Sequence, residues 1–356
     1  MLFSASIAAF ILSTSVLSLS IPRSSQPLSR LDIKLTSAGN TRVKAVLTNK
    51  ASRTLNLLKY NNLLDDGPVK KVELYKNGNP VEFDGMVRHF QTRGLPENVF
   101  VSIRPNEKIE VNFDIASTAD LSAGGSYSIV SRGHIPFAEP STTELTGVVS
   151  YDSNTLKLDI DGTAAASVVK AIPHFLVPRA RLDRPTCGPS FGPVVRAALK
   201  NAAEISLKAA EAAKKNPKLF QEYFRTSNSS AVNTVARRYR AVAKEAASID
   251  SGIVRYYCQD FLGRCTTNML AYTLPRRNTI ANCRGFYQIS PLSTKCRVED
   301  QAATVIHEIT HAVGVFSPHT IDHAYGYQNL TKLTTAQALL NGDTYGLFAV
   351  AVRLGC

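Results

Sequence analysis

Cysteine is absent from the first half of this 356-residue chain, in which the first cysteine is Cys187. A first half without thiols forms no disulfide and offers no thiolate to a metal ion. The C-x-x-C pairs typical of structural zinc sites are absent as well. Because the number of cysteines is even, we expect disulfides, and therefore an oxidising compartment, for the second half.

A second apolar run that could cross a bilayer is also absent. The one long run, residues 1–20, is broken by small residues and followed by Pro22 and Arg23. It is typical of a secretory signal peptide, which we place at residues 1–19, with cleavage near Leu19 or Ser20. We therefore expect a secreted, extracellular monomer without a membrane partner.

Long basic runs are absent despite a net charge of +13. Lysine and arginine are spread over both halves in short runs, such as Arg237-Arg238, and no nucleic-acid-binding motif accompanies them. We expect no specific nucleic-acid partner, although a cationic surface adheres to acidic ones.

What the chain does contain is the motif H-E-x-x-H at residues 307–311. Two histidines four apart on a helix, His307 and His311, can reach one metal ion, and Glu308 points at the same open site. Apolar residues around the motif recur at spacings of three and four, which predicts an amphipathic helix that ends at Gly314. These apolar residues are Ala302, Val305, Ile306, Ile309, Ala312 and Val313. The pattern is typical of a zinc peptidase.

A catalytic zinc needs a third protein ligand and one position left for water. In one common arrangement of zinc peptidases the third ligand lies six residues after the second histidine, but that position is Ser317. In another it is a glutamate further along the chain, but no glutamate follows Glu308. The remaining carboxylates are Asp322 and Asp343, and the remaining imidazoles are His319 and His323. Asp322 lies far enough along the chain from His311 for the backbone to turn back over the metal, and it is our first choice as the third ligand.

The residues from His319 to Gly326 make the motif more specific. With H-E-x-x-H they resemble the aspzincin signature, in which G-T-x-D-x-x-Y-G follows and the Asp is the third zinc ligand. The chain thus resembles deuterolysin, the fungal neutral protease II group of secreted metalloendopeptidases. His319 stands where the signature has Gly, so its imidazole is an alternative ligand. The resemblance continues over residues 209–213, 222–224, 240–246, 270–275 and 280–283.

The resemblance implies a function and a site. One Zn²⁺ ion held by His307, His311 and Asp322 would activate a water that attacks internal peptide bonds of protein and peptide substrates, with Glu308 as general base. Tyr325 would stabilise the oxyanion or simply pack as an aromatic. The implied disulfides are Cys187 with Cys258, Cys265 with Cys283, and Cys296 with Cys356.

Asp343 has three interpretations: a specificity carboxylate in the pocket after the scissile bond, an alternative metal ligand, or a surface residue of a helix. Deuterolysins are associated with basic substrates such as histones and protamines, which a pocket carboxylate would explain. The second half carries more Lys and Arg than Asp and Glu, so long-range charge should oppose such substrates.

Residues 31–160 read as short strands in which apolar and polar residues alternate, separated by turns such as Asn77-Gly78. This pattern predicts an all-β, sandwich-like unit. The histidines of the first half, His89, His134 and His174, stand alone, and we expect them to be ordinary residues.

A stretch rich in Pro and Arg, residues 171–185, predicts a boundary between domains. We expect a β-rich propeptide at residues 20–181 and a mature zinc metalloprotease domain at 182–356, separated by a processing protease after Arg181 or Arg184. The resemblance implies that the propeptide aids folding and inhibits the protease. Because it has no thiol to offer the zinc, it cannot do so as a cysteine switch.

The fold class that we expect is α+β, with a mainly α-helical zincin-type domain that contains a small β element. Predicted helices cover residues 194–215, 231–247 and 335–354, and residues 254–265 and 270–274 are strand-like or turns. We place Arg237, Arg238, Arg240 and Lys244 on a solvated helix face. Asn228 and Asn329 lie in N-glycosylation motifs.

Two other functions remain open. One is a catalytically inactive secreted zinc-binding or adhesion protein, against which the intact Glu308 argues. The other is a structural sandwich protein whose first half is the working part, which uncut residues 171–185 would favour.

Overall fold

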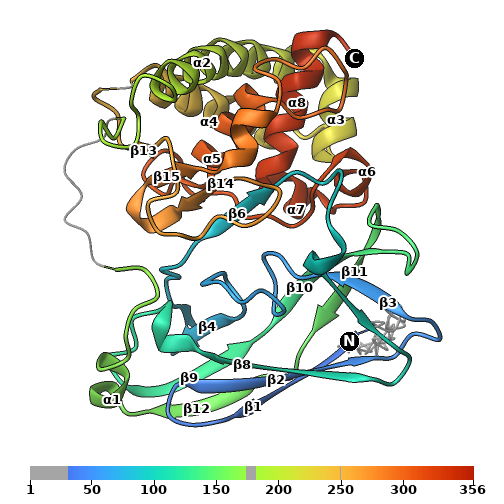
Figure 1. Ribbon diagram of the computed structural model, residues 1–356, viewed down its shortest axis with the longest axis vertical. Coiled ribbons are helices and arrows are strands. Elements are labelled where there is room, and N and C mark those ends of the chain that lie inside the picture. Colours follow the sequence, from blue (N-terminus) through green and yellow to red (C-terminus); the bar gives the residue numbers. More distant parts are fainter. Residues whose placement is uncertain (1–30, 174–181, 249) are drawn as a thin grey trace, which may run out of the picture.

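The computed structural model describes residues 31–173, 182–248 and 250–356, and it is a mixed α/β structure of two units (Figure 1). Residues 31–173 form an all-β unit, and the residues after 182 form a mainly helical unit. The predicted signal peptide, His174 and residues 174–181 of the predicted processing region lie outside the described residues. None of the helices in the described part of the chain has the length and apolar character that a membrane span requires.

The N-terminal unit consists of antiparallel sheets, and the apolar residues that alternate along strands such as β1 lie on one face. β1 (Leu31–Ser37), β2 (Arg42–Asn49) and β8 (Lys108–Asp114) form the first sheet. The second has the order β11 (Leu145–Asp152), β10 (Arg132–Ala138), β3 (Leu55–Leu58), β7 (Phe100–Ile103). The third has the order β12 (Leu156–Ile160), β9 (Gly125–Val130), β4 (Glu73–Lys76), β5 (Asn79–Pro80).

One apolar core joins these three sheets. In β1 the residues Leu31, Ile33 and Leu35 are buried while the residues between them face outward, as the alternation predicts. The predicted turn at Asn77-Gly78 lies between β4 and β5, and both residues have positive φ. A short helix, α1 (Gly162–Ala166), closes the unit.

The C-terminal unit is built from helices around a central one. The helices are α2 (Gly192–Lys215), α3 (Pro217–Phe224), α4 (Ser229–Ala247), α5 (Gln301–His311), α6 (Tyr327–Leu330), α7 (Thr335–Leu339) and α8 (Gly342–Leu354). α5 is buried along its whole length. Its N-terminus is capped by Asp300, whose side chain accepts a hydrogen bond from the backbone of Ala303 at 2.8 Å.

Three disulfides lie in this unit, with the pairing that the resemblance implies: Cys187–Cys258, Cys265–Cys283 and Cys296–Cys356. The last ties the C-terminal residue to the segment before α5. The unit is thus cross-linked close to the helix that carries the H-E-x-x-H motif.

A small sheet connects the two units. It contains β13 (Arg255–Tyr257), β15 (Thr279–Asn282), β14 (Met269–Leu274) and, at its edge, β6 (Val87–Phe90), in that order. β6 comes from the N-terminal unit, and Figure 1 shows it beside the C-terminal elements. A second apolar core spans this junction and includes Tyr60 and Phe90 from one unit and Met269, Tyr272 and Tyr325 from the other.

Several sequence predictions need correction. The predicted helix over residues 335–354 is two helices, because the chain breaks between α7 and α8 at Asn341. α5 ends at His311, before the predicted end at Gly314. Arg238 is 1% exposed, not solvated, and its guanidinium lies over the rings of Phe316 and Tyr345.

The two predicted glycosylation motifs differ in exposure. The Asn329 side chain is buried and donates a hydrogen bond to the Tyr325 carbonyl at 3.1 Å. Asn228 is exposed at the start of α4, where its side chain accepts a hydrogen bond from Ser230. In the folded protein only Asn228 is therefore accessible to a glycan.

Candidate metal and catalytic site

Three predicted ligand side chains converge at the C-terminal end of α5. Asp322 Oδ2 lies 3.3 Å from His307 Nε2 and 3.4 Å from His311 Nε2. The loop that brings Asp322 there is held by the Thr320 backbone N–H, which donates to the Thr310 carbonyl at 3.0 Å, and by the Ile321 N–H, which donates to the Leu340 carbonyl. All three side chains are at most 1% exposed.

The donor atoms fit a zinc ion. Two donors that each lie about 2.0–2.1 Å from a tetrahedral zinc are about 3.4 Å apart, which matches the two separations measured here. His311 Nε2 and Asp322 Oδ1 are buried without a hydrogen-bond partner, a costly arrangement unless a ligand satisfies them. Two imidazoles and a carboxylate are also ligands that zinc prefers.

The backbone around the site fixes the orientation of His311. Its Nδ1 lies 2.9 Å from the Thr320 carbonyl oxygen, so Nδ1 carries the proton and Nε2 keeps its lone pair for a metal. Gly342, directly after the break between α7 and α8, lets the backbone lie close to two of the ligands. A Cβ there would lie 2.9 Å from His311 Cε1 and 3.1 Å from Asp322 Oδ1.

Asp343 lies next to the ligands and is not a surface residue. It is 4% exposed, and its Oδ1 lies 3.7 Å from His307 Nδ1, on the side of the imidazole away from Asp322. Its Oδ2 accepts a hydrogen bond from the Gly326 backbone at 2.7 Å. Asp343 is thus placed to orient His307 rather than to join the three converging ligands.

Charges within this cluster shift the protonation of its members. Burial and His89 disfavour protonation of His307, but Asp322 and Asp343 outweigh both and raise its pKa to about 9. Burial opposes ionisation of Asp322, but His307 and His311 outweigh it and hold the pKa of Asp322 well below its usual value. Negative charge is therefore concentrated where a cation would bind.

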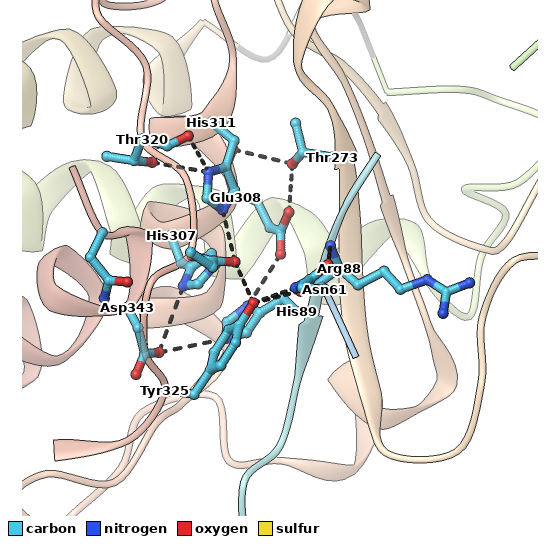
Figure 2. Close-up of polar contacts among 12 residues, drawn as sticks. Asn61, Arg88, His89, Thr273, His307, Glu308, His311, Thr320, Tyr325 and Asp343 are labelled. Carbon is cyan, nitrogen blue, oxygen red and sulfur yellow. Dashed lines mark hydrogen bonds and ion pairs between the residues drawn. The ribbon is translucent and has the colours of Figure 1, made fainter. Parts of the chain in front are cut away.

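Glu308 lies beside the ligands and is fixed by its neighbours. The Thr273 hydroxyl, from β14, donates to Glu308 Oε2 at 2.5 Å (Figure 2). Burial favours the neutral acid, but a hydrogen bond from His89 and the charge of His307 lower the pKa of Glu308 below its ordinary value. Glu308 is therefore an ionised carboxylate, able to accept a proton.

Tyr325 points into the same site. Its hydroxyl lies 2.8 Å from Asp322 Oδ2 and 3.2 Å from the Arg88 carbonyl oxygen, and its ring packs against Phe90 at 4.3 Å between centroids. Burial raises the pKa of Tyr325 well above its ordinary value, so the hydroxyl keeps its proton and can donate a hydrogen bond.

His319 and His323 are not among the ligands that converge. Within the described residues, the groups of side chains close enough to share one ion do not include them. Burial lowers the pKa of each to about 4, so both are neutral at neutral pH.

Two residues of the site were missed by the sequence prediction. His89, expected to be an ordinary histidine, is 1% exposed and enters the site from β6. Its ring stacks on that of His307 at 3.6 Å, Nδ1 lies 3.2 Å from Glu308 Oε1, and Nε2 lies 2.9 Å from Glu299 Oε1. A single histidine in a strand carries no local signal, and neither does Glu299, which precedes the helix.

Comparisons of the sequence with known proteins cover nearly the whole chain. The sequence profile of the deuterolysin metalloprotease (M35) family matches residues 1–356. The chain is 47% identical over 350 residues to neutral protease 2 homolog MEP2 of Coccidioides posadasii (strain C735), covering 98% of this chain and 96% of that protein. It is 48% identical over 322 residues to neutral protease 2 homolog MEP7 of the same organism, covering 90% and 88%. Among solved structures it is similar to a zinc peptidase from Grifola frondosa, with 22% identity, 46% of this chain and 97% of that chain covered, and a TM-score of 0.38.

Proposed function

Because the chain belongs to the deuterolysin metalloprotease (M35) family and is a zinc-dependent metalloendopeptidase, we propose that His307, His311 and Asp322 hold one catalytic Zn²⁺ ion in it. The observation that carries this assignment is the convergence of three buried side chains, with Asp322 Oδ2 at 3.3 Å and 3.4 Å from the two imidazole nitrogens and His311 Nε2 left without a hydrogen-bond partner. The alternative of a binding protein without activity is not favoured, because Glu308 lies beside this site in its ionised form.

The side chains around the ligands have different roles in the proposed hydrolysis. Zinc held by these ligands would supply the Lewis acidity that brings the pKa of a water molecule toward neutrality. Glu308 would accept the proton of that water at its carboxylate and later deliver it to the leaving amine. Thr273 keeps the Glu308 carboxylate in one orientation through its 2.5 Å hydrogen bond. The protonated Tyr325 hydroxyl donates a hydrogen bond to the oxygen of the scissile carbonyl as negative charge develops there.

The substrate preference follows from two carboxylates near the site. Asp343 and Glu299 lie 3.8 Å and 2.9 Å from the same imidazole nitrogen of His89, so both face one position. A basic side chain after the scissile bond would be attracted there, which supports a preference for basic proteins such as histones and protamines. The excess of basic residues in the C-terminal unit opposes this preference at long range.

The enzyme is secreted as a precursor in this proposal. Residues 1–19 direct export, and residues 20–181 form a propeptide that a processing protease removes after Arg181 or Arg184. The position of Leu182 supports this boundary, because its backbone already pairs with Tyr256 of the C-terminal unit. Asp183 also forms an ion pair with Arg255 at 2.6 Å.

The test compares the processed enzyme with two variants. The N-terminus of the secreted form is sequenced, and cleavage of casein and histones is measured with and without a chelator. We expect chelation to abolish cleavage and zinc to restore it. Glu308→Gln should lower the rate at least about 100-fold, because general acid–base catalysis contributes that much.

Glu211→Gln is the matched control, since its carboxylate is 57% exposed on α2 and its ion pairs are weak. Activity that persists in Glu308→Gln, or that survives full removal of metal, contradicts the proposed function.

A further inference from the structure

β6 lies on the C-terminal unit in the manner of an extended peptide. It pairs antiparallel with β14 at the edge of the small sheet, with Val87 opposite Thr273, Arg88 opposite Tyr272 and His89 opposite Ala271. Peptides add to exposed sheet edges in this way, with main-chain hydrogen bonds for affinity and alternate side chains for specificity. The edge of β14 beside the catalytic helix is therefore occupied by the protein's own chain.

The Arg88–His89 peptide lies among the catalytic groups. The Arg88 carbonyl oxygen is 3.2 Å from the Tyr325 hydroxyl, the group assigned to a scissile carbonyl. On the other side of the same peptide, the His89 ring contacts Glu308 (Figure 2). β6 thus presents a carbonyl and the following side chain where a substrate would present its scissile bond and the residue after it.

The His89 side chain fills the position that Glu299 and Asp343 face, which we call the acidic position. Its two nitrogens face Glu308 and Glu299, with Asp343 at 3.8 Å, and its ring covers that of His307. A small cavity of about 50 Å³ continues past Glu299 and Asp343 and is bordered by Arg93, which follows β6. Each oxygen of the Glu308 carboxylate is engaged by a side chain, Oε2 by Thr273 and Oε1 by His89.

The N-terminal unit holds β6 in place by side-chain contacts of its own. Asn61 binds both backbone groups of Arg88: its Oδ1 accepts from the Arg88 N–H at 3.0 Å, and its Nδ2 donates to the Arg88 carbonyl at 2.5 Å. The Arg88 guanidinium pairs with Asp65 at 2.7 Å, and both side chains are at most 4% exposed. Gly67 has no side chain that would collide with this guanidinium.

We propose that β6 is an internal, substrate-like inhibitor, and that His89 is the side chain that keeps the uncut protein inactive by occupying the acidic position and engaging Glu308. This inference rests on the proposed function of the metal and catalytic site. A first half without cysteine thus has another means of blocking the site, and cutting the chain between the units allows β6 to leave. The tight hold of Asn61 on Arg88 keeps the peptide immobile while it is bound.

The test uses the full chain with the junction arginines replaced by glutamine (Arg179→Gln, Arg181→Gln, Arg184→Gln), loaded with zinc and compared with the processed form. Peptide cleavage by the uncut chain should be at least about 100-fold slower. His89→Ala in the uncut chain should raise the rate at least about tenfold, because it frees Glu308 and the acidic position. Asn61→Gly should act in the same direction, since glycine keeps the positive φ of 55° at this position and removes only the side chain.

His134→Ala is the matched control. His134 also belongs to the N-terminal unit and contacts the C-terminal one, through Gln337, but it lies outside the cleft. His134 is half-buried, but its side chain contacts none of the proposed catalytic groups. We therefore expect the rate of this variant to stay within about twofold of the uncut chain.

Amide hydrogen exchange gives a readout that does not depend on activity. The amides of β14 should be protected in the uncut chain and exchange faster after processing and in Asn61→Gly. An uncut chain as active as the processed form overturns the inference, and so does an equal gain in His89→Ala and His134→Ala. A processed form that is inactive with zinc defeats the proposed function instead, and β14 protection unchanged by processing defeats the placement of β6.

Discussion

The two units differ in what holds them together. The N-terminal unit has no cysteine and depends on strand pairing and one apolar core, whereas the C-terminal unit carries three disulfides around a buried helix. Cross-links are found only in the unit that would persist alone after processing. The difference teaches that the cross-links and the candidate site lie in the same unit, while the other unit contributes β6 to the junction.

The largest expected effect on this comparison comes from removing the proposed metal ligand that lies in a loop. Asp322→Ala should lower zinc affinity at least about 100-fold and abolish proteolysis, because three protein ligands are needed to fix a catalytic zinc. Metal content is measured by atomic absorption after dialysis. Asp250→Ala, at a carboxylate that is 78% exposed, should keep full zinc content. Normal zinc content in Asp322→Ala would contradict the ligand assignment.

The second prediction concerns the disulfide that ends the chain. Cys296→Ser with Cys356→Ser opens a loop of 60 residues, which should lower the free energy of unfolding of the processed enzyme by about 4 kcal/mol. Chemical denaturation measures the change. Removal of the shorter Cys265–Cys283 loop, with a separation of 18, should cost less. Equal effects for the two disulfides would contradict an account based on loop length.

The third prediction separates the stability of the two units. Leu47→Ala empties a fully buried position in the N-terminal core and should cost about 2–5 kcal/mol in the uncut chain. An enzyme processed as proposed lacks this residue, so its unfolding midpoint should not depend on the substitution in its precursor. Leu207→Ala, at a side chain that is 54% exposed, is the matched control. Thermal unfolding curves recorded before and after processing measure both midpoints. A lower midpoint in the processed form of Leu47→Ala would contradict the prediction.

The smallest effect is expected at the strand beside the catalytic helix. Thr273→Val removes the hydroxyl that orients Glu308 while keeping the shape of the side chain. We expect kcat to fall about tenfold with little change in KM, because a positioning contact acts mainly on the chemical step. Thr273→Ser should restore most of the rate. A change confined to KM would indicate that Thr273 serves substrate binding.

The sequence predicted the parts of the site that depend on local spacing. His307, Glu308 and His311 are four residues apart or less on one helix, so the period of the helix alone brings them together. Asp322 was placed by exclusion of other ligands and by the resemblance, and the disulfide pairing came from the resemblance alone. The alternation of apolar residues likewise predicted the positions of strands such as β1 and β12.

Contacts between distant segments could not be predicted in this way. His89 reaches Glu308 only because β6 pairs with β14 across more than half of the chain. The predicted C-terminal helix breaks because Asn341 uses its side chain to accept hydrogen bonds from His323 and Ala324, which fixes the loop that carries Asp322. Arg238 looked solvated by its charge, but two aromatic rings enclose it.

The apolar core at the junction has a consequence for making the enzyme. Met269, Tyr272 and Leu274 of β14 are covered partly by Phe90 and Met86 of the other unit. A C-terminal unit synthesised without its partner would have to fold with these side chains uncovered, and apolar surface exposed during folding promotes aggregation. In the proposed maturation they are uncovered only after the unit has folded and its disulfides have formed. Recombinant production is therefore expected to give soluble enzyme when both units are translated as one polypeptide, and inclusion bodies when the second is translated alone.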